Sequence, residues 1–140
     1  MTLWVLDASV LLASEDADDE NHRDARRVLG GRDPLATLDL ALHEVTHVAV
    51  RAWRDLQSAH RLRERVAAVA ADGGLVRADP VLAAGAAALA DGQGISVHDA
   101  AYVAAARLSG GDLVSCDPRD LVSRGLARLP RDVPVARRGA

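Results

Sequence analysis

Two short apolar segments, each followed by an aspartate, constrain the fold of this chain more than any other feature. Residues 3–6 lead into Asp7, and residues 112–116 lead into Asp117. Short apolar runs that contain β-branched residues are typical of buried strands. Further strands are predicted at residues 34–38 and 75–78. Helical segments separate all four runs, and this alternation predicts a mainly parallel sheet, because parallel strands need long crossover connections.

The helices are predicted from the spacing of apolar residues and from the glycines and prolines between them. Together with the strands they predict a three-layer α/β/α fold around a central, mainly parallel sheet of four or five strands. The tail 126–135 is the candidate for the additional strand. No repeat or linker is visible, so residues 1–140 are expected to form one domain, with a frayed basic end from about residue 131. The predicted helices cover residues 9–14, a segment from within 15–20 to Gly30, and residues 40–53, 56–71, 80–91, 96–108 and 118–125.

Composition limits the classes of function. With 49% hydrophobic and 26% charged residues the chain is expected to be globular and soluble. All 17 basic residues are arginine, which suits a phosphodiester substrate, although codon usage explains this bias as well. A net charge of −3 argues against a surface that coats nucleic acid, but it allows an acidic cluster with basic rims.

The chain is expected to be cytoplasmic. Cys116 is its only cysteine, so an intramolecular disulfide is impossible. Asp7 interrupts the N-terminus before the core of a signal peptide could form. Charged residues and glycines also interrupt the alanine-rich runs well before the length of a membrane span, so a membrane role is not expected.

Four acidic residues, widely separated in the sequence, are expected to face one crevice. Asp7 and Asp117 end strands, Asp99 lies in the first turn of a predicted helix, and Glu44 lies in the first half of another. In parallel sheets the carboxyl ends of strands and the N-termini of helices meet at one edge, where ligands bind.

Such a cluster of acids predicts a bound cation. Two carboxylates 4 Å apart repel by about 4 kcal/mol at a protein-like dielectric constant, so a counter-ion is needed. Oxygen ligands without thiolates select Mg²⁺ or Mn²⁺. These ions activate water and stabilise phosphoryl oxygens, which predicts phosphodiester hydrolysis.

Each acid also has a structural explanation. Asp7 and Asp117 could be turn residues at strand ends. Asp99 fits a capping box with Ser96, and Glu44 could be a solvated helix residue. Only the joint pattern favours a functional interpretation, and a catalytically inactive binding module is one alternative to it.

Four segments carry a resemblance to a known family. Residues 5–12 (VLDASVLL) resemble the opening of PIN-domain ribonucleases, above all the toxins of VapBC toxin–antitoxin pairs. Their second and third acidic motifs are similar to residues 42–45 (LHEV) and 96–106 (SVHDAAYVAAA). Residues 113–117 (LVSCD) resemble the fourth motif, in which a Ser or Thr stands two positions before the acid. The likeness extends in order from residue 3 to about residue 122.

The resemblance implies a Mg²⁺- or Mn²⁺-dependent ribonuclease that is the toxin of a type II toxin–antitoxin system. It implies RNA as the substrate and a VapB-type antitoxin that inserts a side chain into the cleft. It also implies a homodimer with a shared basic groove. The Asp117–Pro118 step and the additional acid Asp120, of uncertain role, depart from the family pattern. The catalytic and metal-binding residues that carry over are Asp7, Glu44, Asp99 and Asp117, with Ser115 as a supporting hydroxyl.

A competing motif overlaps Glu44. His43-Glu44-Val45-Thr46-His47 matches H-E-x-x-H, in which two histidines bind Zn²⁺ and the glutamate is the general base of a metallopeptidase. That interpretation needs a third ligand, and Glu64, the only glutamate downstream, lies in a separate predicted helix. It also leaves the three aspartates unexplained.

Two further groups of residues have weaker functional interpretations. His98 is expected to lie at the surface or behind the site. The arginines at positions 51, 54, 61, 63 and 65 could bind RNA beside the cleft or form solvated helix faces.

Overall fold

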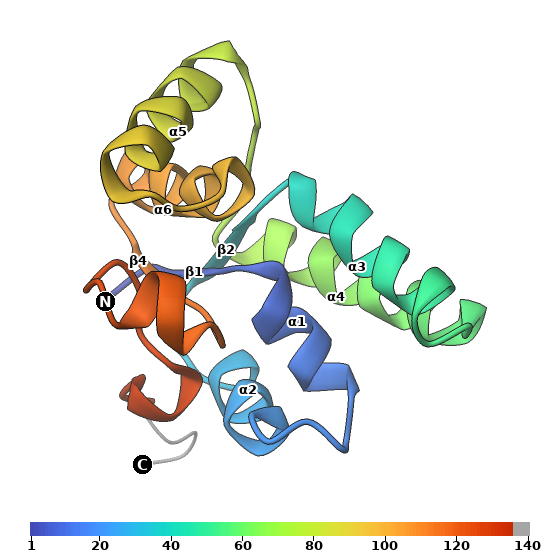
Figure 1. Cartoon of the computed structure of the whole chain (residues 1–140). Coiled ribbons are helices and arrows are strands. Elements are labelled where there is room, and N and C mark those ends of the chain that lie inside the picture. Colours follow the sequence, from blue (N-terminus) through green and yellow to red (C-terminus); the bar gives the residue numbers. More distant parts are fainter. Residues whose placement is uncertain (136–140) are drawn as a thin grey trace.

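The apolar run Trp4–Leu6 forms β1, a central strand that is buried along its whole length. The structure, a computed structural model, describes residues 1–135. Four parallel strands lie in the order β3-β2-β1-β4 (Figure 1), which confirms the expected parallel sheet. Val5 of β1 pairs with Ala36 of β2 on one side and with Leu113 of β4 on the other. The other strands are β2 (Leu35–Leu38), β3 (Leu75–Val76) and β4 (Asp112–Val114).

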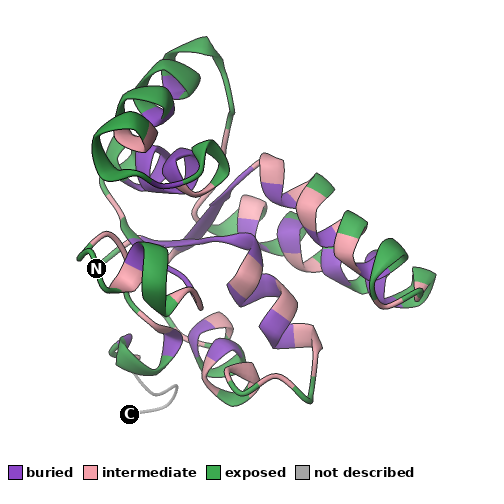
Figure 2. Ribbon diagram, in the orientation of Figure 1, coloured by how far each residue is buried: buried purple, intermediate pink, exposed green. Residues whose placement is uncertain are grey.

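Helices cover both faces of this sheet. In Figure 1, α6 and α5 lie on one side of the strands, whereas α1 and α4 lie on the other. Buried residues concentrate in the strands and in α6, where Ala100 to Ala106 are all buried (Figure 2). The three layers of the predicted fold are thus confirmed. The helices are α1 (Ala8–Glu15), α2 (His22–Leu29), α3 (Leu40–Arg51), α4 (Leu56–Asp72), α5 (Pro80–Gln93) and α6 (Val97–Ser109).

Local sequence signals fix where several helices begin and end. The Asp55 carboxylate accepts hydrogen bonds from two backbone amides at the start of α4, and Asp79 accepts one from the Leu82 amide at the start of α5. Side chains of this kind satisfy amides that have no partner within the helix. Gly94 and Gly110 follow α5 and α6 with φ of 66° and 72°, a left-handed conformation that glycine adopts without strain.

The expected strand in the tail 126–135 is wrong. Arg128 forms only a single parallel bridge, to Val114, and a short 3₁₀ turn, η2 (Pro130–Asp132), follows. Pro130 and Pro134 have no amide hydrogen, so they cannot continue a ladder of hydrogen bonds. The Arg27 guanidinium instead holds this segment against α2 by donating to the carbonyls of Pro130 and Val133. The end of the chain from about residue 131 was expected to be frayed, and residues 136–140 of this segment lie outside the described residues.

Two other boundaries differ from the expected ones. Residues 15–20 were expected to be a solvated turn that starts the second helix, but Glu15 is the last residue of α1 and its side chain is only 9% exposed. The helix expected after Pro118 is a short π-type turn, η1 (Pro118–Val122).

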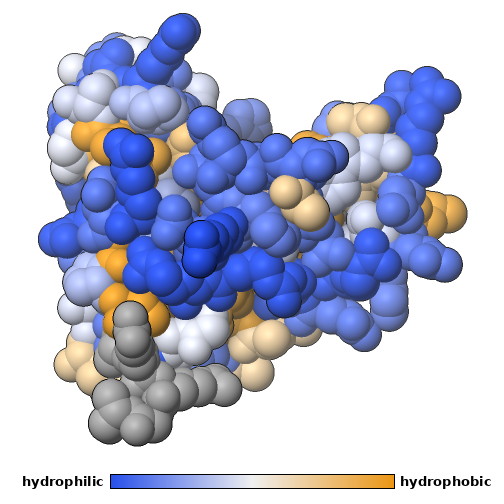
Figure 3. Space-filling model, turned by 90° about the horizontal axis from the view of Figure 1, so that it is seen from below, coloured by the Kyte–Doolittle hydropathy of each residue, from blue (hydrophilic) through white to orange (hydrophobic). Residues whose placement is uncertain are grey.

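A helix with the length and apolarity needed to cross a membrane does not occur in the described part of the chain. The face seen from below in Figure 3 is mostly hydrophilic.

Candidate active site

Asp7 is the most buried acid of the site. It follows β1 and caps α1, where its Oδ1 atom accepts hydrogen bonds from the Val10 amide, at 3.3 Å, and from the Ser9 hydroxyl. Burial raises the pKa of Asp7 to about 6, against the opposing hydrogen bonds of Ser115, Ser9 and Val10, and the charge of Asp99 adds to the increase. A buried carboxylate near a second one is costly to ionise, so a cation beside it would be stabilising.

Two serines join the end of β4 to the start of α1. The Ser9 hydroxyl accepts a hydrogen bond from the Cys116 amide at 2.9 Å, and the fully buried Ser115 hydroxyl accepts one from the Asp117 amide at 3.1 Å. Both hydroxyls also bond to Asp7, so they position the acids from beneath. The sequence interpretation included Ser115 but missed Ser9, although a serine in the first turn after a capping aspartate is a recognisable signal.

Asp99, Asp117 and Asp120 form the tightest group of acids. One carboxylate oxygen from each lies within 4.8 Å of the others. Partial burial raises the pKa of Asp99, and the charges of Asp117 and Asp120 raise it further. Asp117 caps η1, where its Oδ1 atom accepts hydrogen bonds from the Arg119 and Asp120 amides, each at 3.0 Å. The structure therefore brings together two of the four predicted acids, with Asp120 as the third member.

Glu44 lies on α3, beside this group. Partial burial raises the pKa of its carboxyl, and the charges of Asp7 and Asp99 contribute, which places all three acids in one electrostatic site. Within residues 1–135, the buried Oε1 atom of Glu44 has no partner in good hydrogen-bonding geometry, and neither does the hydroxyl of Tyr102 beside it. The Tyr102 hydroxyl nevertheless lowers the pKa of Glu44 as a neighbouring hydrogen-bond donor, so these two groups serve as partners for each other inside the protein.

The donor set fits a hard divalent cation. The five acids offer carboxylate oxygens, which are the ligands that such cations prefer, and one Glu44 oxygen is already desolvated. Burial raises the pKa of the nearby Cys116 thiol to about 12, so this sulfur stays protonated and is a poor ligand. Asp7 and Glu44 lie outside the 4.8 Å group, so the four acids are neighbours but do not all converge on one point.

The zinc motif lacks a complete ligand set. His43 and His47 are both exposed on α3, and the described residues provide no third histidine, cysteine or carboxylate grouped with them. The Glu64 Oε1 atom lies 3.2 Å from the His60 Nε2 atom, one turn earlier on α4, so Glu64 pairs with His60 instead. His98 is exposed at the start of α6, and its charge acts on Glu44 and Asp99, in agreement with a place at the rim of the site.

Comparison with known proteins identifies the family. The PIN-domain model matches residues 4–124, and the chain belongs to the PIN-domain family. The resemblance seen in the sequence is thereby confirmed. No curated protein matches the chain.

Solved structures share the fold at low sequence identity. A toxin–antitoxin complex from Klebsiella pneumoniae aligns with a TM-score of 0.70 and 17% identity over 92% of this chain and 98% of that one. VapC20 from Mycobacterium tuberculosis, a sarcin–ricin loop cleaving toxin, aligns with a TM-score of 0.67 and 21% identity over 87% and 95%. FitAcB from Neisseria gonorrhoeae aligns with a TM-score of 0.67 and 15% identity over 93% and 99%.

Proposed function

We propose that this chain is a Mg²⁺- or Mn²⁺-dependent ribonuclease and the toxin of a type II toxin–antitoxin pair. The observation that carries the proposal is the group of carboxylates at the carboxyl edge of a PIN-domain sheet, with the partly buried Glu44 beside it. The VapC20 toxin that shares this fold is named for cleaving the sarcin–ricin loop, which supports RNA as the substrate class.

The roles of the residues follow from their positions. Asp7, Asp99 and Asp117, joined by Asp120, would hold the cation. When bound, it would stabilise the charge that develops on the phosphoryl oxygens and make water a stronger acid. Glu44 would help to orient the attacking water, because its partly buried carboxylate lies within electrostatic reach of Asp7 and Asp99. Ser9 and Ser115 would keep the Asp7 carboxylate in place.

Removal of divalent cations tests this proposal directly. The purified chain is expected to cut RNA with added Mg²⁺ or Mn²⁺, to lose the activity in EDTA, and to regain it when either ion is restored. Gel analysis of labelled RNA measures the cleavage. Cleavage that persists in EDTA after dialysis, or activity restored by Zn²⁺ alone, would contradict it.

An antitoxin is the proposed protein partner, and the cytoplasm is the proposed location. The structural relatives include toxin–antitoxin complexes. Residues 1–140 would act as one domain whose acidic site accepts a basic side chain of the antitoxin, because five carboxylates lie near one another there. Expression of the chain alone should slow growth, and co-expression of a short protein encoded directly upstream should restore it.

A homodimer is also part of the proposal, and its support lies on the outer face of α5 and α6. An apolar groove of about 600 Å³ lies there, and its lining includes the exposed residues Val81 and Leu108 and the buried Leu82. Val81 and Leu108 are 71% and 62% exposed, which is costly unless a second copy covers them.

Charge placed in this groove should separate the copies. The wild-type chain is expected to elute with twice its 14.7 kDa mass in light scattering, and Val81→Glu to elute at the mass of a single chain. Leu56→Glu, at an equally exposed apolar position on α4, is the matched control and should remain dimeric. Equal masses for Val81→Glu and the wild type would exclude this interface.

A further inference from the structure

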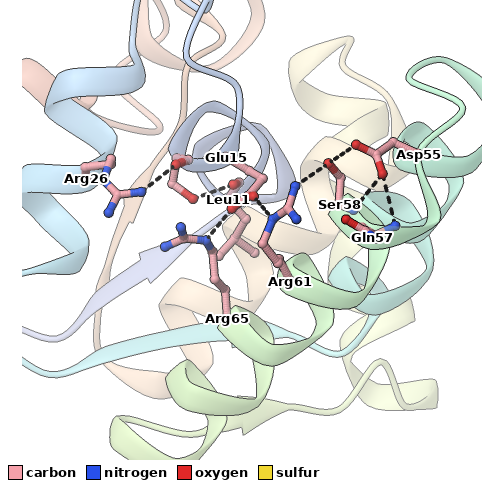
Figure 4. Close-up of polar contacts among 9 residues, drawn as sticks. Leu11, Glu15, Arg26, Asp55, Gln57, Ser58, Arg61 and Arg65 are labelled. Atoms are coloured by element: carbon pink, nitrogen blue, oxygen red, sulfur yellow. Dashed lines mark hydrogen bonds and ion pairs between the residues drawn. The ribbon is translucent and has the colours of Figure 1, made fainter.

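The series of arginines on α3 and α4 separates into two groups in the structure. The Arg61 and Arg65 guanidiniums both pair with the Glu15 carboxylate at the end of α1, and Arg65 does so at 3.0 Å (Figure 4). These pairs hold the pKa of Glu15 below its usual value, against the opposing effect of its burial. Arg61 also donates to the Ser58 hydroxyl at 2.9 Å. Both cations are therefore committed to joining α4 to α1.

Arg51 and Arg54 form no such ion pairs within residues 1–135. Arg51 is the last residue of α3, and Arg54 lies in the turn that leads to α4, at the outer end of the paired helices in Figure 1. Both residues are exposed, and neither has an ion-pair or side-chain hydrogen-bond partner within residues 1–135. Their guanidiniums are free to bind a partner outside the chain.

The backbone at Arg54 is unusual. Its φ of 51° makes it the only non-glycine residue with a positive φ in the described part of the chain. Glycine or asparagine adopts this conformation at lower cost. The turn itself is fixed by hydrogen bonds from the Trp53 amide to the Val48 carbonyl and from the Asp55 amide to the Ala49 carbonyl. An arginine kept at a strained, exposed position without an internal partner suggests a role for its side chain.

Helix geometry connects Arg51 to the carboxylates. Arg51 follows Glu44 by seven residues, which is close to two helical turns, so both lie on the same side of α3 about 10 Å apart along the axis. His47 is exposed between them on that side, three residues after Glu44. Figure 1 shows α3 leading outward from the sheet edge to this turn. The side of α3 therefore leads from an anionic site to a cationic end.

We propose that Arg51 and Arg54, with His47 between them and the site, bind the RNA backbone and position the strand over the carboxylates. The proposal rests on the proposed ribonuclease function. A group of carboxylates repels a polyanion, so cations are needed beside it to hold the substrate. Arginine grips phosphate oxygens with two parallel hydrogen bonds.

The test measures RNA binding separately from cleavage. Asp99→Asn removes a proposed metal ligand, and a fluorescein-labelled single-stranded 12-mer RNA reports binding to this protein by anisotropy. In that background, Arg51→Gln with Arg54→Gly is expected to weaken binding about tenfold at 0.1 M salt. The slope of log affinity against log salt concentration should become shallower by about 1.4, since each phosphate contact on a single strand contributes about 0.7.

Two controls separate this role from a structural one. Arg63→Gln removes an exposed arginine from α4 that is outside the proposed surface, and it should leave both the affinity and the salt slope unchanged. Arg54→Gly alone relieves the strained backbone. In the Asp99→Asn background, its melting temperature should therefore be no lower than that of the Asp99→Asn protein, while its affinity for RNA should be weaker. Loss of binding together with unimpaired stability is the expected signature.

The outcomes distinguish this inference from the proposed function. If the wild-type chain does not cut RNA but binding still depends on Arg51 and Arg54, the ribonuclease proposal fails and the binding surface stands. If the wild-type chain cuts RNA and the double variant binds as tightly as the Arg63→Gln control, the binding surface is excluded. The binding surface would also be excluded if the protein did not bind RNA at all. The same holds if Arg51 and Arg54 proved to bind only an acidic protein partner and not RNA.

Discussion

Replacing Asp99 with asparagine is expected to lower metal-dependent RNA cleavage at least about a hundredfold while leaving the fold intact. The Asp99 carboxylate lies within 4.8 Å of two other acids, and a neutral amide is a poorer ligand for a hard cation than a carboxylate. The cap of α6 should survive, because the Asp99 amide still donates to the Ser96 hydroxyl, and the asparagine Oδ1 atom can still accept the hydrogen bond that Ser96 gives to the Asp99 carboxylate.

Single-turnover cleavage of a labelled RNA measures this loss, and circular dichroism checks the fold. Asp112→Asn is the matched control, because that carboxylate is exposed at the start of β4, at the opposite edge of the sheet. The control should cleave at the wild-type rate. If Asp99→Asn kept its activity within threefold of the control, the assignment of the site would be wrong.

Replacing Asp7 with asparagine is expected to make the metal-free protein more stable at pH 7 while it abolishes cleavage. The pKa of Asp7 is about 6 in the folded chain, above its value of 3.8 in an unfolded one. Between these values the folded state binds more protons than the unfolded state, so stability falls as the pH rises through this window. Asparagine avoids that cost, which is about 3 kcal/mol at most above pH 6.

The pH dependence separates this effect from ordinary repacking. Urea unfolding in EDTA should give Asp7→Asn a large advantage over the wild type at pH 7 and little advantage near pH 3, which lies below both pKa values, so that Asp7 is mostly protonated in the folded and the unfolded state. Addition of Mg²⁺ at pH 7 should stabilise the wild type and leave Asp7→Asn almost unchanged. Parallel stability curves for the two proteins across this pH range would refute the buried-charge explanation.

Much of the fold was predictable because its determinants are local. The apolar run before Asp7, the capping serine before Asp99 and the glycines after α5 and α6 each fix an element through neighbouring residues. The rule that strand ends and helix starts share one edge then placed the acids near each other. Most predicted boundaries of strands and helices agree with the observed ones within a few residues.

The remaining features depend on contacts that spacing does not reveal. Asp120 joins the acidic group only because a π-type turn follows Asp117, and no periodic pattern marks such a turn. The pairing of Glu15 with Arg61 and Arg65 spans 46 and 50 residues, so a stretch that looked solvated contains a nearly buried carboxylate. The motif around His43 matched a zinc signature because two exposed positions of one helix happened to carry histidine.

The lengths of the outer strands bear on how the protein behaves in concentrated solution. β3 has two residues and β4 three, and the segment at Arg128 already occupies part of the open side of β4. Long, unpaired outer strands are templates on which other chains add and aggregates grow. A sheet with so few unpaired backbone groups on its outer strands offers little template for the addition of further strands. Copies of this chain are therefore expected to associate through helical surfaces and not to form fibrils.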